Sequence, residues 1–488
     1  MLFNSIQFLL FFPVVCVLYY AIPDKAKNLW LLVASYFFYM CWNPYYVLLL
    51  LFSTVITYAC GLALGKTSQK AGKQFAVGLC VILNIGLVIY FKYSEFLLSN
   101  INYVLKLLGW KAMNIKIDIL LPVGISFYTF QALSYIIDVY YAKIAAEKNF
   151  VNYALFVSFF PQLVAGPIER SGHFLPQLRE KHKFNFYRMR DGILLMLYGF
   201  FQKVVIADRL AKIVDEMFNH YGGYPGYFTI AAVFVFSIQI YCDFGGYSNI
   251  AIGAAKVLGF ELTQNFRQPY LARNVKDFWQ RWHITLTSWF RDYLYIPLGG
   301  NKKGHAKALI NVLIVFAVSG LWHGAAWHYV VWGILNGVFQ EIGRATGKFR
   351  LRRQGKEDYS SDGLLTVWVQ RGITFILVAF TWLFFRADSV KVALRMCSHA
   401  IGNIFTNWKR YIYIPGIERY EYGIVMISLL ILVVIDITHE KGISIQRLLD
   451  SRSKGLRWFC YMALIFIVVF GGAYGGANNE NAFIYFQF

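Results

Sequence analysis

His323 is the residue of this sequence whose type and surroundings most directly suggest chemistry. It lies in the middle of a mostly apolar stretch, residues 308–339. An ionisable side chain at membrane depth is costly, so it needs a partner, an aqueous cavity or a chemical task. Histidine also titrates near neutral pH, which suits it to taking and returning a proton. Two interpretations stay open: a neutral imidazole hydrogen-bonded between helices, or an acid–base catalyst.

A second concentration of polar side chains lies at residues 277–300, which read DFWQRWHITLTSWFRDYLYIPLGG. If this segment is helical, Asp277 and Arg281 stand four residues apart and can form an ion pair. His283 then lies beside Thr287, and the proline and glycines near residue 300 end the helix. The segment either supplies groups to a site or lies at the membrane interface as an amphipathic helix with its aromatic side chains at the headgroup level.

Other kinds of chemistry are not indicated by the sequence. His323 and His328 are five residues apart, about 140° around a helix, so they do not share the face that a pair of metal ligands needs. The seven cysteines include no Cys-x-x-Cys pair. The chain also has no Gly-x-Ser-x-Gly motif of a serine nucleophile. We therefore expect neither a metal site nor a covalent serine.

The composition indicates a membrane protein. Apolar residues make up 58% of the 488 residues and charged residues only 15%, a balance that a soluble globule could not present to water. The formal net charge is +21, and the positive-inside rule places the basic loops around Lys66, 344–353 and 447–457 in the cytoplasm. Because no basic stripe lies on a soluble domain, we expect no nucleic-acid partner.

Apolar segments recur along the chain without a long polar linker, which predicts one integrated helical domain, residues 1–488. Segments 151–167, with two prolines, and 243–260, rich in glycine, are expected to be broken or re-entrant. Such backbone is tolerated at membrane depth only where protein or a water-filled cavity surrounds it, so we expect a polar chamber. The expected spans are 4–22, 29–42, 45–64, 75–97, 118–141, 188–206, 227–241, 308–325, 326–342, 365–386, 422–437 and 457–474.

Two long runs, RWHITLTSWFRDYLYIPLGG at 281–300 and SGLWHGAAWHYVVWGILNG at 319–337, resemble the membrane-bound O-acyltransferase family. The likeness is greatest to its bacterial branch of alginate O-acetyltransferases and peptidoglycan-acetylating relatives. It implies an all-α fold of about 11–13 transmembrane or re-entrant helices around a membrane-crossing funnel, with a catalytic core at 118–345. Supporting stretches are MLFNSIQFLLFFP at 1–13, LPVGISFYTFQALSYIIDVY at 121–140, FFPQLVAGPIER at 159–170, IQIYCDFGGYSNIAIG at 238–253, TWLFFRAD at 381–388 and FIYFQF at 483–488.

The resemblance also implies roles for individual residues. His323 matches the catalytic histidine, and His283 matches the second signature position. Where the family has a serine and an aspartate in a DFSGYSD-like stretch, this chain has Gly245 and Asn249, so an ion pair at 249 lacks its carboxylate, although Asp243 is kept. Further candidates for contact with substrate or for lining the funnel are Trp322, Asp277, Arg281, Trp282, Arg291, Gln239 and Asn336.

The implied activity is transfer of an acetyl group from a thioester to a hydroxyl of a cell-surface polysaccharide. Such a transfer needs a base for the alcohol proton, and a positioned histidine typically contributes roughly 10²–10⁴-fold. Trp322, His283 and nearby backbone amides are candidate donors to the oxyanion. No cofactor is implied, because acetyl-CoA, or less favourably an acyl carrier protein, serves as donor substrate. The expected location is the bacterial inner membrane.

An exported partner of the SGNH-hydrolase type is also implied. The polar stretches between apolar segments are short for binding a polymer, and the serine nucleophile elbow is missing, so serine-based transfer onto the sugar would come from another protein. The acceptor glycan, alginate-like or peptidoglycan, is not identified by the sequence.

Two alternative functions stay open. One is D-alanyl transfer to teichoic acid from a carrier protein, although the terminal stretches MLFNSIQFLLFFP and FIYFQF resemble the acetylating branch more closely. The other is a transporter or acyl conduit whose partner does the chemistry. Transporters usually contain related halves with matching interrupted helices, and we find no such repeat.

Overall fold

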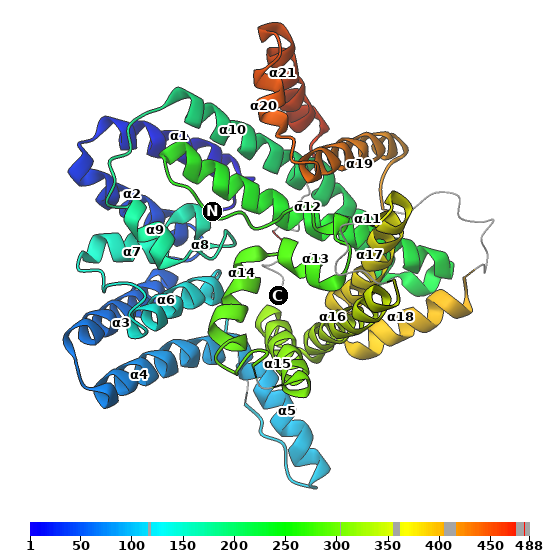
Figure 1. Ribbon diagram of the computed structural model, residues 1–488, viewed down its shortest axis with the longest axis horizontal. Helices are drawn as coiled ribbons and strands as arrows, with labels where there is room; N and C mark the ends of the chain where they lie inside the picture. The colour runs from blue at the N-terminus through cyan, green and yellow to red at the C-terminus, as the bar shows by residue number, and fades with distance from the viewer. Residues whose placement is uncertain (116–118, 303, 355–361, 405–415, 475–482, 484–488) are drawn as a thin grey trace. The chain divides into compact units, whose positions relative to one another are not determined.

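The computed structural model describes the chain except for residues 116–118, 303, 355–361, 405–415, 475–482 and 484–488, and except for the side chains of 348–354. Within the described residues the protein consists of helices joined by turns and loops and has no strand (Figure 1). The prediction of an all-α membrane fold is confirmed. The membrane-crossing funnel stays a prediction.

The chain forms two compact units. The first comprises residues 1–196 and 250–263, and the second comprises 197–249 and 264–488. The single-domain organisation expected from the sequence stays a prediction. The helices before residue 200 are α1 Ile6–Ala21, α2 Asp24–Met40, α3 Tyr46–Lys66, α4 Lys70–Val88, η1 Ile89–Tyr93, α5 Ser94–Leu107, α6 Ile125–Tyr140, α7 Phe150–Ser158, α8 Phe160–Leu163, α9 Ser171–Gln177 and α10 Phe186–Phe200.

The chain after residue 200 continues the helical pattern and carries the candidate site. Its helices are η2 Phe201–Ala207, α11 Asp208–Asn219, η3 Tyr221–Gly223, α12 Gly226–Leu258, η4 Pro269–Leu271, α13 Val275–Arg281, α14 Ile284–Phe290, η5 Arg291–Tyr295, α15 His305–His323, α16 Trp327–Gln354, α17 Leu364–Arg386, α18 Val390–Gly402, α19 Arg419–Glu440, α20 Ile445–Asp450 and α21 Lys454–Gly471.

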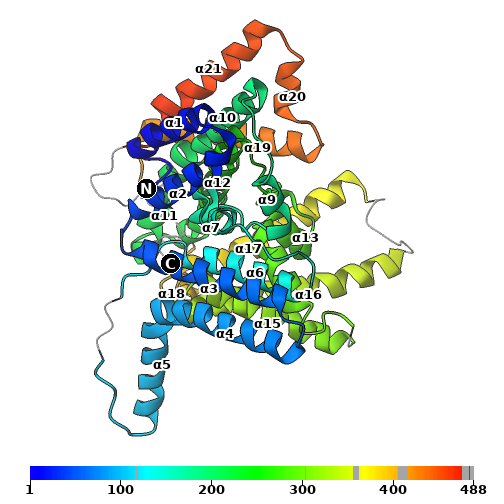
Figure 2. The ribbon, with the colours of Figure 1, turned by 90° about the vertical axis from the view of Figure 1, so that its left-hand side faces the viewer.

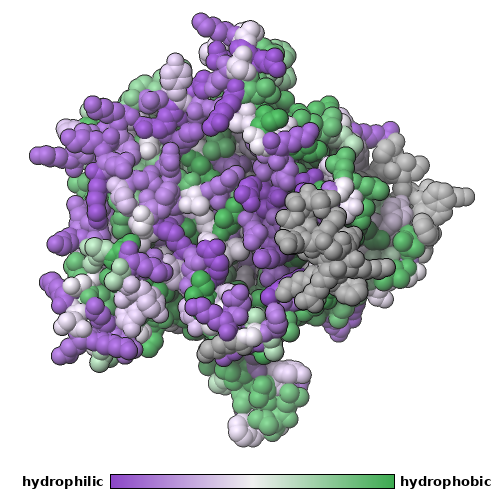
Figure 3. Space-filling model, viewed as in Figure 1, coloured by the Kyte–Doolittle hydropathy of each residue, from purple (hydrophilic) through white to green (hydrophobic). Residues whose placement is uncertain are grey.

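Seven helices of the described chain are long and apolar enough to cross a membrane. In the first unit α3 and α4 are among them, and they lie side by side with α6 (Figure 2). Hydrophobic side chains also cover α5, at the bottom of the view in Figure 3, where Val104 and Leu107 are exposed. Such apolar outer surfaces are suited to contact with lipid. The seven helices are Tyr46–Lys66, Lys70–Leu107, Gly226–Leu258, His305–His323, Leu364–Arg386, Arg419–Glu440 and Lys454–Gly471.

The prediction that segment 243–260 is broken is wrong, because α12 runs without interruption from Gly226 to Leu258. The glycines of this segment instead allow close backbone packing. A Cβ atom at Gly246 would lie 2.7 Å from the carbonyl oxygen of Gly199. Small residues let helix backbones approach in this way without ending the helix.

The predicted interruption at 151–167 is confirmed. α7 ends at Ser158, and α8 begins at Phe160 after a residue with non-helical backbone angles. The amide nitrogen of Phe160 donates a hydrogen bond to Ser35 Oγ at 3.1 Å, and its ring contacts Phe38, with centroids 5.6 Å apart. This tertiary contact fixes the break within the first unit.

Segment 277–300 is helical only in part. α13 ends at Arg281, and α14 begins at Ile284 after His283, whose backbone is left-handed with φ 43° and ψ 55°. The chain therefore turns at the residue that the sequence singles out. The expected ion pair within α13 is confirmed, with Arg281 Nε 2.8 Å from Asp277 Oδ1.

Candidate active site

His323 is the last residue of α15, in the second unit, and it is buried. The chain reverses after it, so that α16 packs back along α15. Glycines set this contact: a Cβ at Gly320 would lie 2.1 Å from the carbonyl oxygen of Tyr329, and a Cβ at Gly333 would lie 2.1 Å from that of Phe316. The close approach of the two backbones fixes the end of α15, and with it the position of His323.

Aromatic rings surround the His323 imidazole. The ring centroids of Trp322, Trp332 and Phe385 lie 4.9, 5.1 and 5.5 Å from that of His323, each nearly perpendicular to it. Trp332 comes from α16 and Phe385 from α17, so three helices contribute to this environment. In surroundings of low polarity, interactions between the imidazole and a bound polar group are stronger than in water.

A cluster of buried tryptophans continues from this environment. Trp332 stacks on Trp382 with centroids 5.5 Å apart, and Trp282 lies 5.1 Å from Trp382. Trp279 joins them at 5.7 Å from Trp332. The structure therefore places the candidate Trp282 in the aromatic core, where it packs the end of α13 against α17.

His283 is held through Asn265, a residue that no motif in the sequence indicates. His283 Nδ1 lies 3.1 Å from Asn265 Oδ1, which also accepts hydrogen bonds from the backbone nitrogen and Oγ1 of Thr285 at 3.4 and 2.8 Å. A backbone N–H can only donate, so the Asn265 atom facing it is the oxygen, and His283 Nδ1 must carry the hydrogen. Neutral His283 therefore presents Nε2 as a hydrogen-bond acceptor.

Burial in this environment lowers the pKa of His283 to about 3. The imidazole thus stays neutral near physiological pH. Its left-handed backbone is supported by two backbone hydrogen bonds, from Ile284 to the Asn265 carbonyl and from Arg267 to the Arg281 carbonyl, both 2.9 Å. A left-handed conformation is unfavourable for a residue with a side chain, and such strain persists where the surroundings hold it, frequently at functional sites.

His283 and His323 both lie beside the indole ring of Trp322. The ring of Trp322 lies 6.3 Å from that of His283 and 4.9 Å from that of His323, measured between centroids. His283 also contacts Phe244 of α12, with centroids 4.7 Å apart. Of the residues singled out in the sequence, His283, Trp322 and His323 therefore form one cluster.

Asp277 and Arg281 belong to an ion network and not to this cluster. The Arg281 guanidinium contacts both Asp277 and Glu440, the latter at 2.6 Å. Glu440 also pairs with Arg371 at 2.9 Å. The network links α13 to α17 and α19, and we infer that it holds the helix that leads into His283.

We expect Glu440→Ala to lower the free energy of unfolding by about 1–3 kcal/mol, because two partly buried guanidinium groups lose a charged hydrogen-bond partner. The midpoint of thermal unfolding in detergent would then fall by a few degrees. The matched control is Arg291→Ala, since Arg291 pairs with its neighbour Asp292 while its side chain is 64% exposed. An equal fall in both variants would contradict a specific role for the network.

The remaining candidates have varied surroundings. Asp243 forms a buried ion pair with Lys203, which also lies 2.9 Å from Asp208. Asn336 donates to the Trp332 carbonyl at 2.8 Å within α16. Gln239 is buried, and its Oε1 has no hydrogen-bond partner among the described residues, so it stays a candidate for contact with a ligand.

The departures from the family motif on α12 are compensated locally. Asn249 Nδ2 donates a hydrogen bond to Gln202 Oε1 at 2.7 Å, so a neutral pair stands where a carboxylate is missing. A Cβ at Gly245 would contact the Tyr241 ring at 3.6 Å, an ordinary van der Waals distance. Position 249 therefore carries a neutral hydrogen bond to Gln202 and no ion pair.

Comparison with known proteins identifies the family of the chain. The model of the membrane-bound O-acyltransferase family matches residues 141–384. A probable alginate O-acetylase AlgI of Pseudomonas putida is 34% identical, and the match covers the whole of both chains. The peptidoglycan O-acetyltransferase of Helicobacter pylori is 34% identical over 82% of this chain and 80% of its own. A teichoic acid D-alanyltransferase of Bacillus subtilis is 27% identical over 44% of this chain and 57% of its own. The chain belongs to the membrane-bound O-acyltransferase family.

Proposed function

We propose that this protein transfers an acetyl group from acetyl-CoA in the cytoplasm towards a hydroxyl of an extracytoplasmic polysaccharide, across the bacterial inner membrane. The observation that carries the proposal is the buried His323 beside Trp322 and His283. The relatives named for O-acetylation match most or all of the chain, whereas the named D-alanyltransferase matches less than half. This difference favours acetyl transfer over D-alanyl transfer.

In the proposed reaction His323 acts as a general base. It takes the proton of the acceptor hydroxyl while that oxygen attacks the thioester carbonyl. The tetrahedral intermediate collapses with cleavage of the carbon–sulfur bond, and the proton passes from His323 to the leaving thiolate. The new ester bond replaces the thioester, and no covalent bond to the protein is needed.

His283 has an orienting role in this proposal. Its Nδ1 hydrogen is committed to Asn265, so Nε2 can accept a hydrogen bond but cannot donate one to an oxyanion. Donation to the oxyanion, one of the roles considered for His283 from the sequence, therefore does not fit this tautomer. Acceptance of a hydrogen bond from a substrate group would align that group beside His323.

We further propose an exported SGNH-hydrolase-like partner that places the acetyl group on the glycan. The acceptor hydroxyl at His323 then belongs to this partner or to a small relay molecule. In liposomes containing the purified chain, acetyl-CoA and deacetylated alginate or peptidoglycan, we expect acetylated polymer only when the partner is added. The ester content of the polymer measures this, and efficient acetylation by the chain alone would contradict the division of labour.

The end of α16 is basic and contains Lys348, Arg350, Arg352 and Arg353, whose side chains lie outside the described part of the structure. Topology alone explains a cytoplasmic basic segment. If these residues also attract the anionic donor, changing all four to glutamine raises the Michaelis constant for acetyl-CoA about tenfold at low salt. High salt removes the difference by screening. An unchanged constant at low salt leaves only the topological role.

A further inference from the structure

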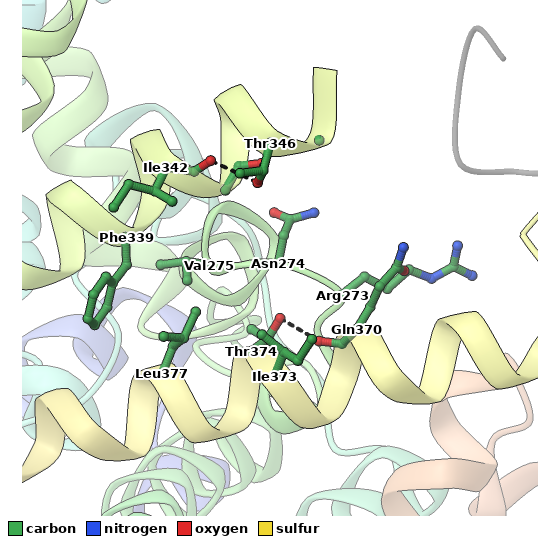
Figure 4. Close-up of a pocket in the computed structure, with 12 residues that line it drawn as sticks. Arg273, Asn274, Val275, Phe339, Ile342, Thr346, Gln370, Ile373, Thr374 and Leu377 are labelled. Carbon is green, nitrogen blue, oxygen red and sulfur yellow. Dashed lines mark hydrogen bonds between the residues drawn. The ribbon is translucent and has the colours of Figure 1, made fainter. Parts of the chain in front are cut away.

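A cleft of about 460 Å³ lies within the second unit, between α16, α17 and the beginning of α13 (Figure 4). None of its lining residues belongs to the cluster around His323 and His283. The cleft is therefore a separate feature of the same unit.

The two ends of the cleft differ in polarity. Figure 4 shows Phe339 and Leu377 at one end, Arg273 and Gln370 at the other, and Asn274 between them. On both long helices the polar end lies towards the loop that joins α16 to α17. The positive-inside rule places the basic segment 344–353, at the end of α16, in the cytoplasm. With this placement, the polarity of the cleft decreases from its cytoplasmic end towards the interior of the membrane.

The wall of the cleft exposes apolar side chains at the surface of the second unit. Ile342 on α16 and Ile373 on α17 line the cleft and are 54% and 56% exposed, and α17 is one of the helices long and apolar enough to cross a membrane. Because α17 can cross a membrane by its length and composition, we infer that lipid surrounds these exposed side chains. An acyl chain in the cleft would cover the apolar side chains of Ile342 and Ile373.

We propose that the cleft binds one anionic phospholipid of the cytoplasmic leaflet. Its acyl chain lies against Phe339 and Leu377, and its headgroup lies beside Arg273, the charged residue among the described lining residues. The orientation matches that of a lipid in this leaflet, with the headgroup at the interface and the tail towards the centre. A basic side chain near the cytoplasmic surface of the membrane attracts anionic lipid headgroups, and Arg273 supplies one such charge to the cleft.

The position of the cleft connects its occupant to the candidate active site. Asn274 lines the cleft and caps α13, where its Oδ1 accepts a hydrogen bond from the amide of Asp277 at 2.9 Å. Val275, the first residue of α13, also lines the cleft. A bound lipid would therefore contact the beginning of the helix that leads into His283.

The proposal is tested by replacing one glycine of the cleft wall with leucine, whose side chain takes up part of the space. A Cβ at Gly343, on the wall of the cleft, meets no atom within 4 Å, so Gly343→Leu adds apolar bulk at this wall from a backbone position with open space beside it. Gly372→Leu on α17 is the matched control, because its Cβ also meets no atom within 4 Å and it does not line the cleft. Each protein is taken from nanodiscs of phosphatidylglycerol and phosphatidylethanolamine into detergent and weighed by native mass spectrometry.

We expect wild type and Gly372→Leu to retain one tightly bound phosphatidylglycerol that Gly343→Leu loses. Equal retention by the two leucine variants would overturn the proposal. Arg273→Gln, which leaves the apolar wall intact, is expected to keep a lipid but to lose the preference for phosphatidylglycerol, and an unchanged preference would overturn the headgroup assignment. Displacement of the lipid by added acetyl-CoA would assign the cleft to the acyl donor and overturn the lipid proposal. A dimer mass that is present in wild type and absent only in Gly343→Leu would assign the cleft to a second copy of the chain and also overturn it. None of these readouts requires transferase activity.

Discussion

His323→Ala is expected to abolish detectable glycan acetylation, because it removes the only base assigned to the acceptor hydroxyl. Loss of a positioned histidine that transfers the proton costs roughly 10²–10⁴-fold in rate. The variant should still fold and insert, since α15 is anchored by its glycine contacts with α16, and alanine is easier than imidazole to place at membrane depth. The measurement is the O-acetyl content of the cell-surface glycan, with the amount of membrane-inserted protein determined in the same cells.

His328→Ala is the matched control for this prediction. His328 is also a buried histidine, five residues further along the chain, but its Nδ1 bonds to the backbone carbonyl of Phe384 at 3.0 Å. We expect this variant to keep most of its activity at equal protein level. Normal acetylation by His323→Ala would remove His323 from the mechanism, and equal loss in both variants would indicate a structural effect.

His283→Ala is expected to lower the rate by about 10²-fold, the cost of misplacing a reacting group, and thus less than His323→Ala. Asn265→Ala should cause a similar loss, because Asn265 fixes the tautomer and orientation of the imidazole through the 3.1 Å contact with Nδ1. The two losses should not add in the double variant, since both remove one aligned acceptor. Full activity of Asn265→Ala would contradict the orienting role.

The variant Asn265→Asp tests whether Asn265 orients the His283 ring or only packs against it. The measurement is the pH dependence of the rate. In wild type the pKa of His283 is about 3 because of burial, so the ring is neutral and accepts at Nε2 throughout the range above about pH 5. A buried carboxylate beside Nδ1 favours the charged ring and raises its pKa. Below that raised pKa, Nε2 becomes a donor, and activity is expected to fall; above it, activity returns. A pH profile identical to that of wild type would contradict the assigned tautomer.

The features that the sequence predicts correctly depend on local periodicity and on residue type. Apolar runs identify the long helices, and spacing along one helix predicts the pair of Asp277 and Arg281. The error at 243–260 arises because glycine alone does not distinguish a break from a close helix contact. The packing role of Gly246 is evident only from the structure, in which the backbone of Gly199 lies next to it.

Residues that act through tertiary partners were not foreseen. Asn265 lies 18 residues before His283, and Glu440 lies 159 residues after Arg281. Asn265 stands in the polar loop TQNFRQP at 263–269, and a buried asparagine in a loop gives no periodic signal. Its role depends on that loop folding back against the turn between α13 and α14, which no local pattern in the sequence encodes.

Release of free thiol from acetyl-CoA by the purified protein in liposomes shows whether this chain itself cleaves the thioester with His323. With a hydroxyl acceptor present, we expect release to be proportional to the amount of wild-type protein, nearly unchanged in His328→Ala and reduced to background in His323→Ala. Release at background level from folded wild-type protein, together with passage of intact acetyl-CoA across the membrane, would identify the chain as a conduit whose partner does the chemistry.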